Sequence, residues 1–206
     1  MIYQSDLWLS YLFRFVGRRF YAAQIETATK QVEARTTLLQ IYSSIDFNEL
    51  VIALVVAEDR RFFRHFGVDY YGIARAIFAY TTKRQVQGAS TITQQLVRVI
   101  VNDYRFSFQR KLKEICIAVE IDRILDKESQ ARLYLLLGYY GWRMNGLTAA
   151  MTRLCISFPC STEQAAQIIA RLKYPEPEHS SVHQSNRIDR RASHLCNLIQ
   201  EYRDGF

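Results

Sequence analysis

Turn-forming residues are scarce along this chain, and their scarcity restricts the folds open to it. The 206 residues include only 8 glycines and 3 prolines. A protein built from many short strands needs frequent tight turns, which glycine and proline supply. We therefore predict a mainly α fold. The length suits one domain with a sizeable apolar core.

Capping residues and apolar spacing indicate where the helices begin and end. Asp46 and Glu49 have the spacing of a capping box ahead of a strongly apolar helix, residues 50–57. Ser161 and Gln164 have the same spacing. Periodic apolar positions indicate further helices over residues 69–80, 90–102, 107–125, 128–140, 148–156, 161–174 and 186–202.

The charge balance favours an anionic partner. Lys and Arg total 27 and Asp and Glu total 20, which leaves a formal net charge of +7. Such an excess suits a nucleic acid, an anionic membrane surface or a phosphorylated substrate, and the charge alone does not choose among them. The four cysteines and four histidines form no ligand pattern, so no metal site is expected.

The N-terminal stretch is rich in aromatic residues but is not a membrane span. The run from Leu7 to Val16 is about half the roughly 20 apolar residues that a span needs, and it contains Arg14. It also lacks the basic start and small-residue cleavage site of a secretory signal. Two readings are open: a helix lying in the membrane interface, or a helix that packs on the domain.

The first segment with evident chemistry is Glu58-Asp59-Arg60-Arg61-Phe62-Phe63-Arg64-His65-Phe66-Gly67. Glu58 ends an apolar run, and a carboxylate at the edge of an apolar wall is partly desolvated, which makes it a stronger general base. Asp59 is expected to hold the local turn beside it. The plainer alternative is a surface ion pair of Glu58 with Arg61 or Arg64.

The second segment, Gly88-Ala89-Ser90-Thr91-Ile92-Thr93-Gln94-Gln95, opens a helix with polar side chains. Free N–H groups at a helix start attract phosphate, and glutamine amides hydrogen-bond sugar hydroxyls and phosphate oxygens. Arg98 follows Gln94 by four residues and shares its face. Taken alone, the segment also fits an ordinary capped N-terminal turn.

The third segment, Arg110-Lys111-Leu112-Lys113-Glu114, concentrates cations around a carboxylate. We expect Arg110, Lys113 and Glu114 to share one helical face. Fixed cations there would stabilise a leaving group whose negative charge grows as its bond breaks. The plainer alternative is a solvated face with an ion pair between Arg110 and Glu114.

In this order and spacing the three segments resemble the peptidoglycan glycosyltransferases, the transglycosylase domains of bifunctional penicillin-binding proteins and of monofunctional transglycosylases. The first two match the patterns E-D-x-x-F-x-x-H-x-G and G-x-S-T-I-T-Q-Q at every fixed position, and the third matches R-K-x-K-E. The resemblance implies a lysozyme-like helical domain over residues 45–206. A small membrane-proximal segment, residues 1–44, would precede it.

The resemblance also implies roles for individual residues. Glu58 would be the general base that takes the proton from the 4-hydroxyl of the acceptor sugar, and Glu114 a second catalytic carboxylate. The acceptor oxygen would attack the anomeric carbon of a lipid-linked disaccharide-peptide, with loss of undecaprenyl pyrophosphate and inversion. The implied substrate-binding residues are Asp59, Ser90, Gln94, Gln95, Arg98, Arg110 and Lys113.

The implied setting is cell wall biogenesis and cell shape, at the outer (periplasmic) face of a bacterial inner membrane. The partners would be the lipid-linked substrate, the membrane surface and other cell-wall synthesis proteins, with no nucleic acid. The motifs require no cofactor, and the resemblance leaves open a divalent cation, Mg²⁺ or Mn²⁺, beside the pyrophosphate.

The resemblance weakens after Glu120. The family's fourth motif reads about I-L-E-x-Y-L-N, whereas the stretch here is Ala131-Arg132-Leu133-Tyr134-Leu135-Leu136. Arg132 replaces the acidic residue and Leu136 the asparagine. This change supports an alternative function, a catalytically degenerate member that binds lipid-linked precursor or a cell-wall synthesis partner.

Two further alternatives come from other functional classes. A lytic glycan hydrolase would use Glu58 as general acid, but cleaving an uncharged glycosidic bond needs no cationic third segment. A basic nucleic-acid binder would place its cations in a helix-turn-helix or among aromatic residues, and neither pattern is evident.

Overall fold

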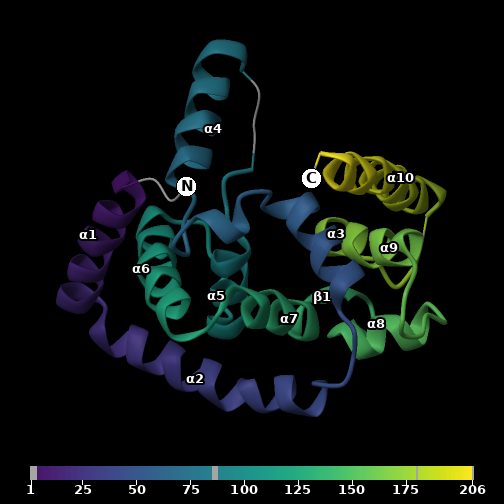
Figure 1. Ribbon diagram of the computed structural model, residues 1–206, viewed down its shortest axis with the longest axis horizontal. Coiled ribbons are helices and arrows are strands. Elements are labelled where there is room, and N and C mark those ends of the chain that lie inside the picture. The colour runs from purple at the N-terminus through teal and green to yellow at the C-terminus, as the bar shows by residue number, and fades with distance from the viewer. Residues whose placement is uncertain (1–3, 85–87, 180, 206) are drawn as a thin grey trace. The chain divides into compact units, whose positions relative to one another are not determined.

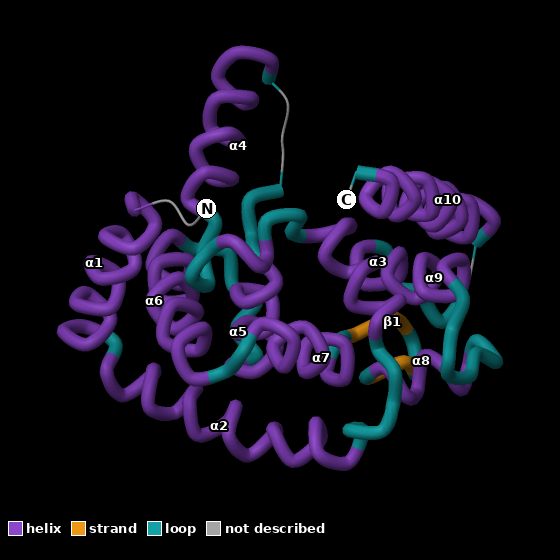
Figure 2. Tube along the Cα trace, viewed as in Figure 1, coloured by secondary structure: helices purple, strands orange, loops and turns teal. Residues whose placement is uncertain are grey.

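The computed structural model describes residues 4–84, 88–179 and 181–205. Over these ranges the chain forms ten α-helices, one short 3₁₀ turn and one two-stranded antiparallel sheet (Figures 1 and 2). The predicted mainly α fold is therefore confirmed.

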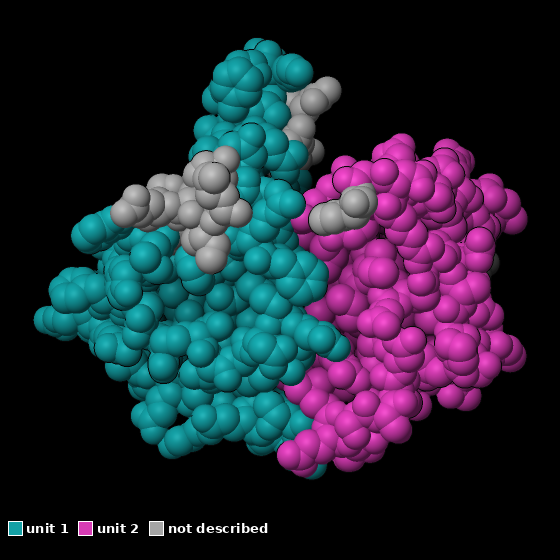
Figure 3. Space-filling model, viewed as in Figure 1, with its two compact units in different colours: residues 1–37, 61–130 teal, residues 38–60, 131–206 magenta. Residues whose placement is uncertain are grey.

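Contacts divide the chain into two compact units, coloured separately in Figure 3. Unit 1 comprises residues 1–37 and 61–130, and unit 2 comprises residues 38–60 and 131–206. Unit 1 contains 17 Lys and Arg against 10 Asp and Glu, whereas unit 2 contains 10 of each kind. The whole net charge of +7 therefore belongs to unit 1. The expected boundary between residues 44 and 45 is a different division and stays a prediction.

Unit 1 is organised around the helix α6, which contacts both α1 and α5. Ser107 caps α6, because its hydroxyl accepts a hydrogen bond from the Arg110 backbone N–H at 3.1 Å. Ile117 and Ile121 of α6 and Leu96 of α5 are buried in its core. The elements of this unit are α1 (Gln4–Phe20), most of α2 (Ala22–Ile41), η1 (Phe62–Arg64), α4 (Tyr70–Lys83), α5 (Ile92–Val101), α6 (Phe108–Ile124) and the start of α7 (Lys127–Leu137).

The N-terminal helix α1 packs on α6 and is amphipathic. Its opposite face leaves large apolar side chains in solvent, with Trp8 72% and Phe15 70% exposed. The reading in which this helix packs on the domain is thus confirmed, and contact of its exposed face with a membrane stays a prediction. Within the described ranges, no helix is both long enough and apolar enough to cross a bilayer.

Unit 2 is organised around α9, which contacts α3 and α10. Leu50 and Leu54 of α3, Ile168 of α9 and Leu195 of α10 are fully or almost fully buried. Gly141 in the first strand pairs with the backbone of Glu176. The elements of this unit are α3 (Asn48–Glu58), the rest of α7, β1 (Tyr139–Gly141), β2 (Met144–Asn145), α8 (Leu147–Arg153), α9 (Thr162–Lys173) and α10 (Val182–Asp204).

One of the two predicted capping boxes is confirmed and the other is wrong. Ser161 and Gln164 form both reciprocal bonds at the start of α9. At α3 the N-cap is Phe47, without a side-chain cap. Asp46 lies one residue too early and accepts instead from the Asn48 N–H at 2.9 Å. Glu49 turns away and forms an ion pair with Arg203 of α10.

The two changed residues of the fourth motif, Arg132 and Leu136, pack within unit 2. Arg132 on α7 donates to the carbonyl oxygens of Tyr42 and Ile45, each at 3.2 Å, and its guanidinium lies 4.7 Å from the centre of the Phe47 ring. Leu136 is buried. Arg132 thus satisfies backbone carbonyls just before α3, the helix that ends in Glu58.

Gly67 joins the first two segments to α6. It has a positive φ of 76°, and a Cβ atom placed there would lie 2.5 Å from the carbonyl oxygen of Ala118. The Thr91 hydroxyl donates to the Gly67 carbonyl at 2.6 Å and also caps α5 by accepting from the Gln94 N–H. The glycine is therefore required for both its conformation and its lack of a side chain.

We predict that Gly67→Ala lowers the free energy of unfolding by at least about 1–2 kcal/mol, because alanine is strained at positive φ and its methyl group meets a backbone oxygen. Urea unfolding followed by circular dichroism measures the change. Gly88→Ala is the matched control, since a Cβ at Gly88 meets nothing within 4 Å. Equal stability of the two variants would contradict the prediction.

Candidate functional site

Glu58 is the last residue of α3, at the end of a buried apolar stretch. Val55 and Val56 before it are buried, whereas the Glu58 side chain is 19% exposed. Arg191 of α10 places a guanidinium nitrogen 3.7 Å from a Glu58 carboxylate oxygen and donates to the Ala57 carbonyl at 3.0 Å. The carboxylate is thus partly desolvated, as expected, and has a cation beside it.

Asp59 follows directly and ends the helix. It is buried, and its backbone N–H donates to the Val55 carbonyl at 2.9 Å. Arg61, one of the two ion-pair partners that the plainer reading proposed for Glu58, forms an ion pair with Asp69 at 3.3 Å. Arg191, the partner that the structure adds, lies far along the chain, where no local spacing rule could reveal it.

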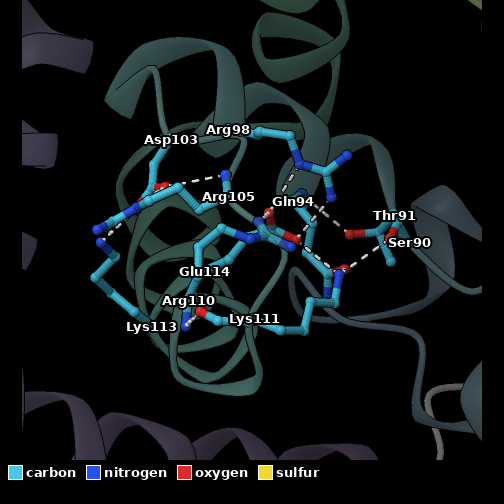
Figure 4. Close-up of polar contacts among 11 residues, drawn as sticks. Ser90, Thr91, Gln94, Arg98, Asp103, Arg105, Arg110, Lys111, Lys113 and Glu114 are labelled. Carbon is cyan, nitrogen blue, oxygen red and sulfur yellow. Dashed lines mark hydrogen bonds and ion pairs between the residues drawn. The ribbon is translucent and has the colours of Figure 1, made fainter.

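The second and third segments meet around the carboxylate of Glu114 (Figure 4). Glu114 is only 3% exposed. Arg98 donates to both of its oxygens, at 3.0 and 3.2 Å, and Arg110 donates at 2.5 Å. Lys111 contacts the same carboxylate at 2.6 Å. One buried carboxylate therefore gathers three cations, which we call the Glu114 cluster.

Lys111 also joins the cluster to the start of α5. Its ammonium donates to the Ser90 hydroxyl at 3.0 Å and to the Gln94 side-chain oxygen at 2.6 Å. Gln94 is fully buried, and its amide nitrogen has no hydrogen-bond partner among the residues that the structure describes. A buried, unsatisfied donor beside an ammonium can bind an anionic oxygen.

The predicted position of Lys113 on the face of Glu114 is wrong. Lys113 forms an ion pair with Asp103 at 2.8 Å, and Arg105 binds the same carboxylate at 2.8 and 2.9 Å. Consecutive helical residues point about 100° apart, so Lys113 and Glu114 cannot share a face. Lys111, three residues before Glu114, does share it, and this spacing would have identified Lys111 from the sequence.

The pKa values reflect the three-to-one ratio of cations to carboxylate. Burial disfavours the Glu114 carboxylate, but hydrogen bonds from Arg98 and Lys111 and their charges outweigh burial, so the pKa of Glu114 lies below its ordinary value. Burial and the neighbouring charges of Arg98 and Arg110 lower the pKa of Lys111, against the opposing effect of Glu114. The cluster carries excess positive charge.

The remaining site residues fall outside the Glu114 cluster. Gln95 lies on α5 and is half-buried. Glu58 and Asp59 belong to unit 2, whereas the Glu114 cluster belongs to unit 1. The cluster itself brings together Ser90, Gln94, Arg98, Arg110 and Glu114 of the predicted set and adds Lys111.

The Glu114 cluster does not fit a divalent cation. Both carboxylate oxygens already accept hydrogen bonds from cations, and three positive charges would repel a metal ion. Within the described ranges, no three His, Cys, Asp or Glu side chains gather as metal ligands. An anion is the ligand that the chemistry of this cluster favours.

Comparison with known proteins identifies the family. A family model described as "Transglycosylase" matches residues 24–199. The chain belongs to the transglycosylase family. The family membership predicted from the three segments is therefore confirmed, and the helical units agree with the mainly α, lysozyme-like fold that it implied.

Similar proteins include penicillin-binding proteins 1A from several bacteria. The chain is 35% identical to that of Aquifex aeolicus over 167 residues, which cover 79% of this chain and 23% of the relative. It is 44% identical to that of Vibrio cholerae over 103 residues, which cover 50% of this chain and 12% of the relative. It is 40% identical to that of Neisseria gonorrhoeae over 107 residues, which cover 51% of this chain and 13% of the relative. The chain thus spans less than a quarter of the length of these relatives.

We predict that Glu114→Gln destabilises the transglycosylase chain at neutral pH by on the order of 2 kcal/mol or more, because three cations lose their anion. A lowered carboxylate pKa stabilises the fold above the ordinary value of 4.5 and ceases to do so as the pH falls through the lowered pKa. Part of the acid-induced loss of stability in the parent should therefore be missing in Glu114→Gln.

Thermal melts from neutral to acidic pH measure this difference. Glu178→Gln is the control, because Glu178 is exposed and lies outside the cluster. The assignment of a stabilising role to the Glu114 carboxylate is refuted if both variants melt like the parent at every pH.

Proposed function

We propose that this chain is a peptidoglycan glycosyltransferase, which polymerises a lipid-linked disaccharide-peptide into glycan strands. The observation that carries the proposal is the excess positive charge of the Glu114 cluster in a transglycosylase-family chain. Transfer from a lipid pyrophosphate releases a polyanion, and a cluster of half-buried cations suits that leaving group.

Glu58 acts as the general base. Its carboxylate takes the proton from the 4-hydroxyl of the acceptor sugar, and the acceptor oxygen attacks the anomeric carbon of the donor as the bond to the pyrophosphate breaks. Attack from the face opposite the leaving group inverts the anomeric configuration. Arg191 acts as a positioning residue, because it contacts both the Glu58 carboxylate and the backbone of Ala57.

The Glu114 cluster receives the leaving group. Negative charge on the pyrophosphate grows as the glycosidic bond breaks, so fixed cations stabilise the transition state more than the bound donor. Glu114 holds Arg98, Arg110 and Lys111 together. The two arginines keep further N–H groups for phosphate oxygens, whereas the three N–H groups of Lys111 already donate to Glu114, Ser90 and Gln94 and its contribution is its charge. The buried amide nitrogen of Gln94 adds a neutral donor. In this proposal the bound donor is also contacted by four further side chains, those of Ser90, Gln95, Asp59 and Lys113.

The substrate places the protein at a membrane surface. A prenyl-linked donor stays in the bilayer, so the site must lie within reach of the headgroups, at the periplasmic face of a bacterial inner membrane. Residues 45–206 carry the transfer and residues 1–44 approach the membrane. The exposed apolar side chains of α1 support this arrangement; they are Trp8, Tyr11, Leu12 and Phe15.

A second candidate is a degenerate family member that binds the lipid-linked precursor, or a cell-wall synthesis partner, without turnover. The observation that favours it is the altered fourth motif, in which Arg132 replaces an acidic residue and Leu136 an asparagine. Both side chains are accommodated in unit 2, where Arg132 binds two carbonyl groups. Donor binding by the parent protein without any polymer would favour this candidate over the enzyme.

We predict that Glu58→Gln lowers the rate of polymerisation on the order of 100-fold or more, because the amide cannot accept the acceptor proton. Incubation of purified protein with lipid-linked disaccharide-peptide, followed by gel analysis of the glycan, measures the rate. Donor affinity and the melting temperature are the controls and should match the parent. Activity within a few-fold of the parent would remove Glu58 from the role of base.

We predict that Lys111→Met weakens use of the pyrophosphate-linked donor at least about 10-fold, because the Glu114 cluster loses one of its cations. Lys113→Met is the matched variant on the same helix. Its effect should be smaller, because Asp103 neutralises Lys113. Arg110→Ala should resemble Lys111→Met.

Donor affinity by fluorescence titration and the initial rate of polymerisation report these effects. If donor affinity and rate stay at the parental values in all three variants, the third segment is a solvated, ion-paired face and does not bind the donor. A larger loss in Lys113→Met than in Lys111→Met would place the anion beside Asp103 rather than beside Glu114.

A further inference from the structure

A pocket of about 380 Å³ lies within unit 1, away from the side chains of the Glu114 cluster. It is formed by residues of α1, of the segment around η1 and of α6, together with Lys127. The site proposed for glycosyl transfer uses none of its lining side chains. The pocket is therefore a separate feature that needs its own explanation.

The lining of the pocket is rich in cations. Arg14 and Arg123 line it and share the carboxylate of Glu120, which they approach at 3.2 and 3.0 Å. Lys127 forms an ion pair with Asp122 at 2.6 Å. Arg64 is exposed and has no ion pair within residues 7–84, 88–179 and 181–205, whose side chains the structure describes. Positive charge therefore exceeds negative charge around the pocket, and an anion would be attracted to it.

The same pocket has apolar walls that stay exposed at its mouth. Leu7 is 40% exposed, and Tyr11 and Phe63 are each 55% exposed. Along α1 the apolar surface continues through Leu12 and Phe15, which do not line the pocket. Contiguous apolar surface of this kind indicates an interaction site.

We infer that this pocket binds one anionic phospholipid of the membrane. The lipid phosphate meets Arg64, Arg14 and Arg123, and an acyl chain covers Leu7, Tyr11 and Phe63. A free phosphate would satisfy the cations but leave the apolar mouth in water, whereas a phospholipid satisfies both. This binding goes beyond the proposed glycosyl transfer, since it needs neither donor nor turnover.

The test measures binding of a soluble short-chain phosphatidylglycerol to the whole protein by calorimetric titration. The expected result is saturable binding of one lipid per chain. Arg64→Gln should weaken it about fivefold, the effect of one arginine near an anionic lipid. The matched control Arg190→Gln removes an exposed arginine of unit 2 and should bind as the parent does.

A second pair of variants separates the pocket from the rest of α1. Leu7→Ser should weaken the short-chain lipid severalfold, because Leu7 lines the pocket. Leu12→Ser removes an equally large, exposed leucine of the same helix and should leave the affinity unchanged. Melting curves of all four variants should match the parent, since the replaced side chains are exposed.

Three outcomes would overturn the inference. The first is equal loss in Leu7→Ser and Leu12→Ser, which would make α1 a general interfacial helix without a lipid pocket. The second is binding of glycerol phosphate as tightly as the short-chain lipid, which would make the site a phosphate site. The third is parental affinity in Arg64→Gln. The Glu58→Gln protein should bind the lipid normally, so a failure of the proposed transferase function leaves this test intact.

Discussion

The buried carboxylate of Glu114 is the interaction on which the candidate site depends. It sits on α6, and it draws Arg98 from α5 and both Arg110 and Lys111 from its own helix. Without the carboxylate, three cations at this distance would repel one another and turn toward solvent. With it, the three cations are held in a fixed arrangement whose net charge is still positive. Preorganisation of this kind is what electrostatic catalysis requires.

The helix α6 repeats this arrangement one and a half turns later. Glu120 is also buried, and it accepts ion pairs from Arg14 and Arg18 of α1 and from Arg123. Burial disfavours its charged form, but hydrogen bonds from Arg123 and Arg14 and their charges outweigh burial and lower the pKa of Glu120. One helix thus uses two acidic residues to arrange two groups of cations. The second group attaches the N-terminal helix, and two of its members, Arg14 and Arg123, line the lipid pocket.

Local rules predicted much of this structure, and their limits explain the errors. Capping by Ser161 depends only on Gln164 three positions later, so the sequence was sufficient. The same spacing at Asp46 and Glu49 misled, because the helix α3 begins one residue later than the rule requires. The prediction for Lys113 is wrong because adjacent residues of a helix point about 100° apart, so nearness to Glu114 in sequence does not bring the two side chains together. Arg191 beside Glu58 was not predictable, because the packing of α10 on α3 depends on the whole of unit 2.

The contacts of Arg132 make it difficult to replace by an acidic residue. Its guanidinium satisfies two carbonyl oxygens and lies over an aromatic ring. An acidic side chain restored at this position would direct a carboxylate at those same oxygens, with no proton to share. The return to the family's residue would therefore require the preceding loop to change first. An acidic residue at position 132 is thus compatible with unit 2 only together with a second change among residues 42–47.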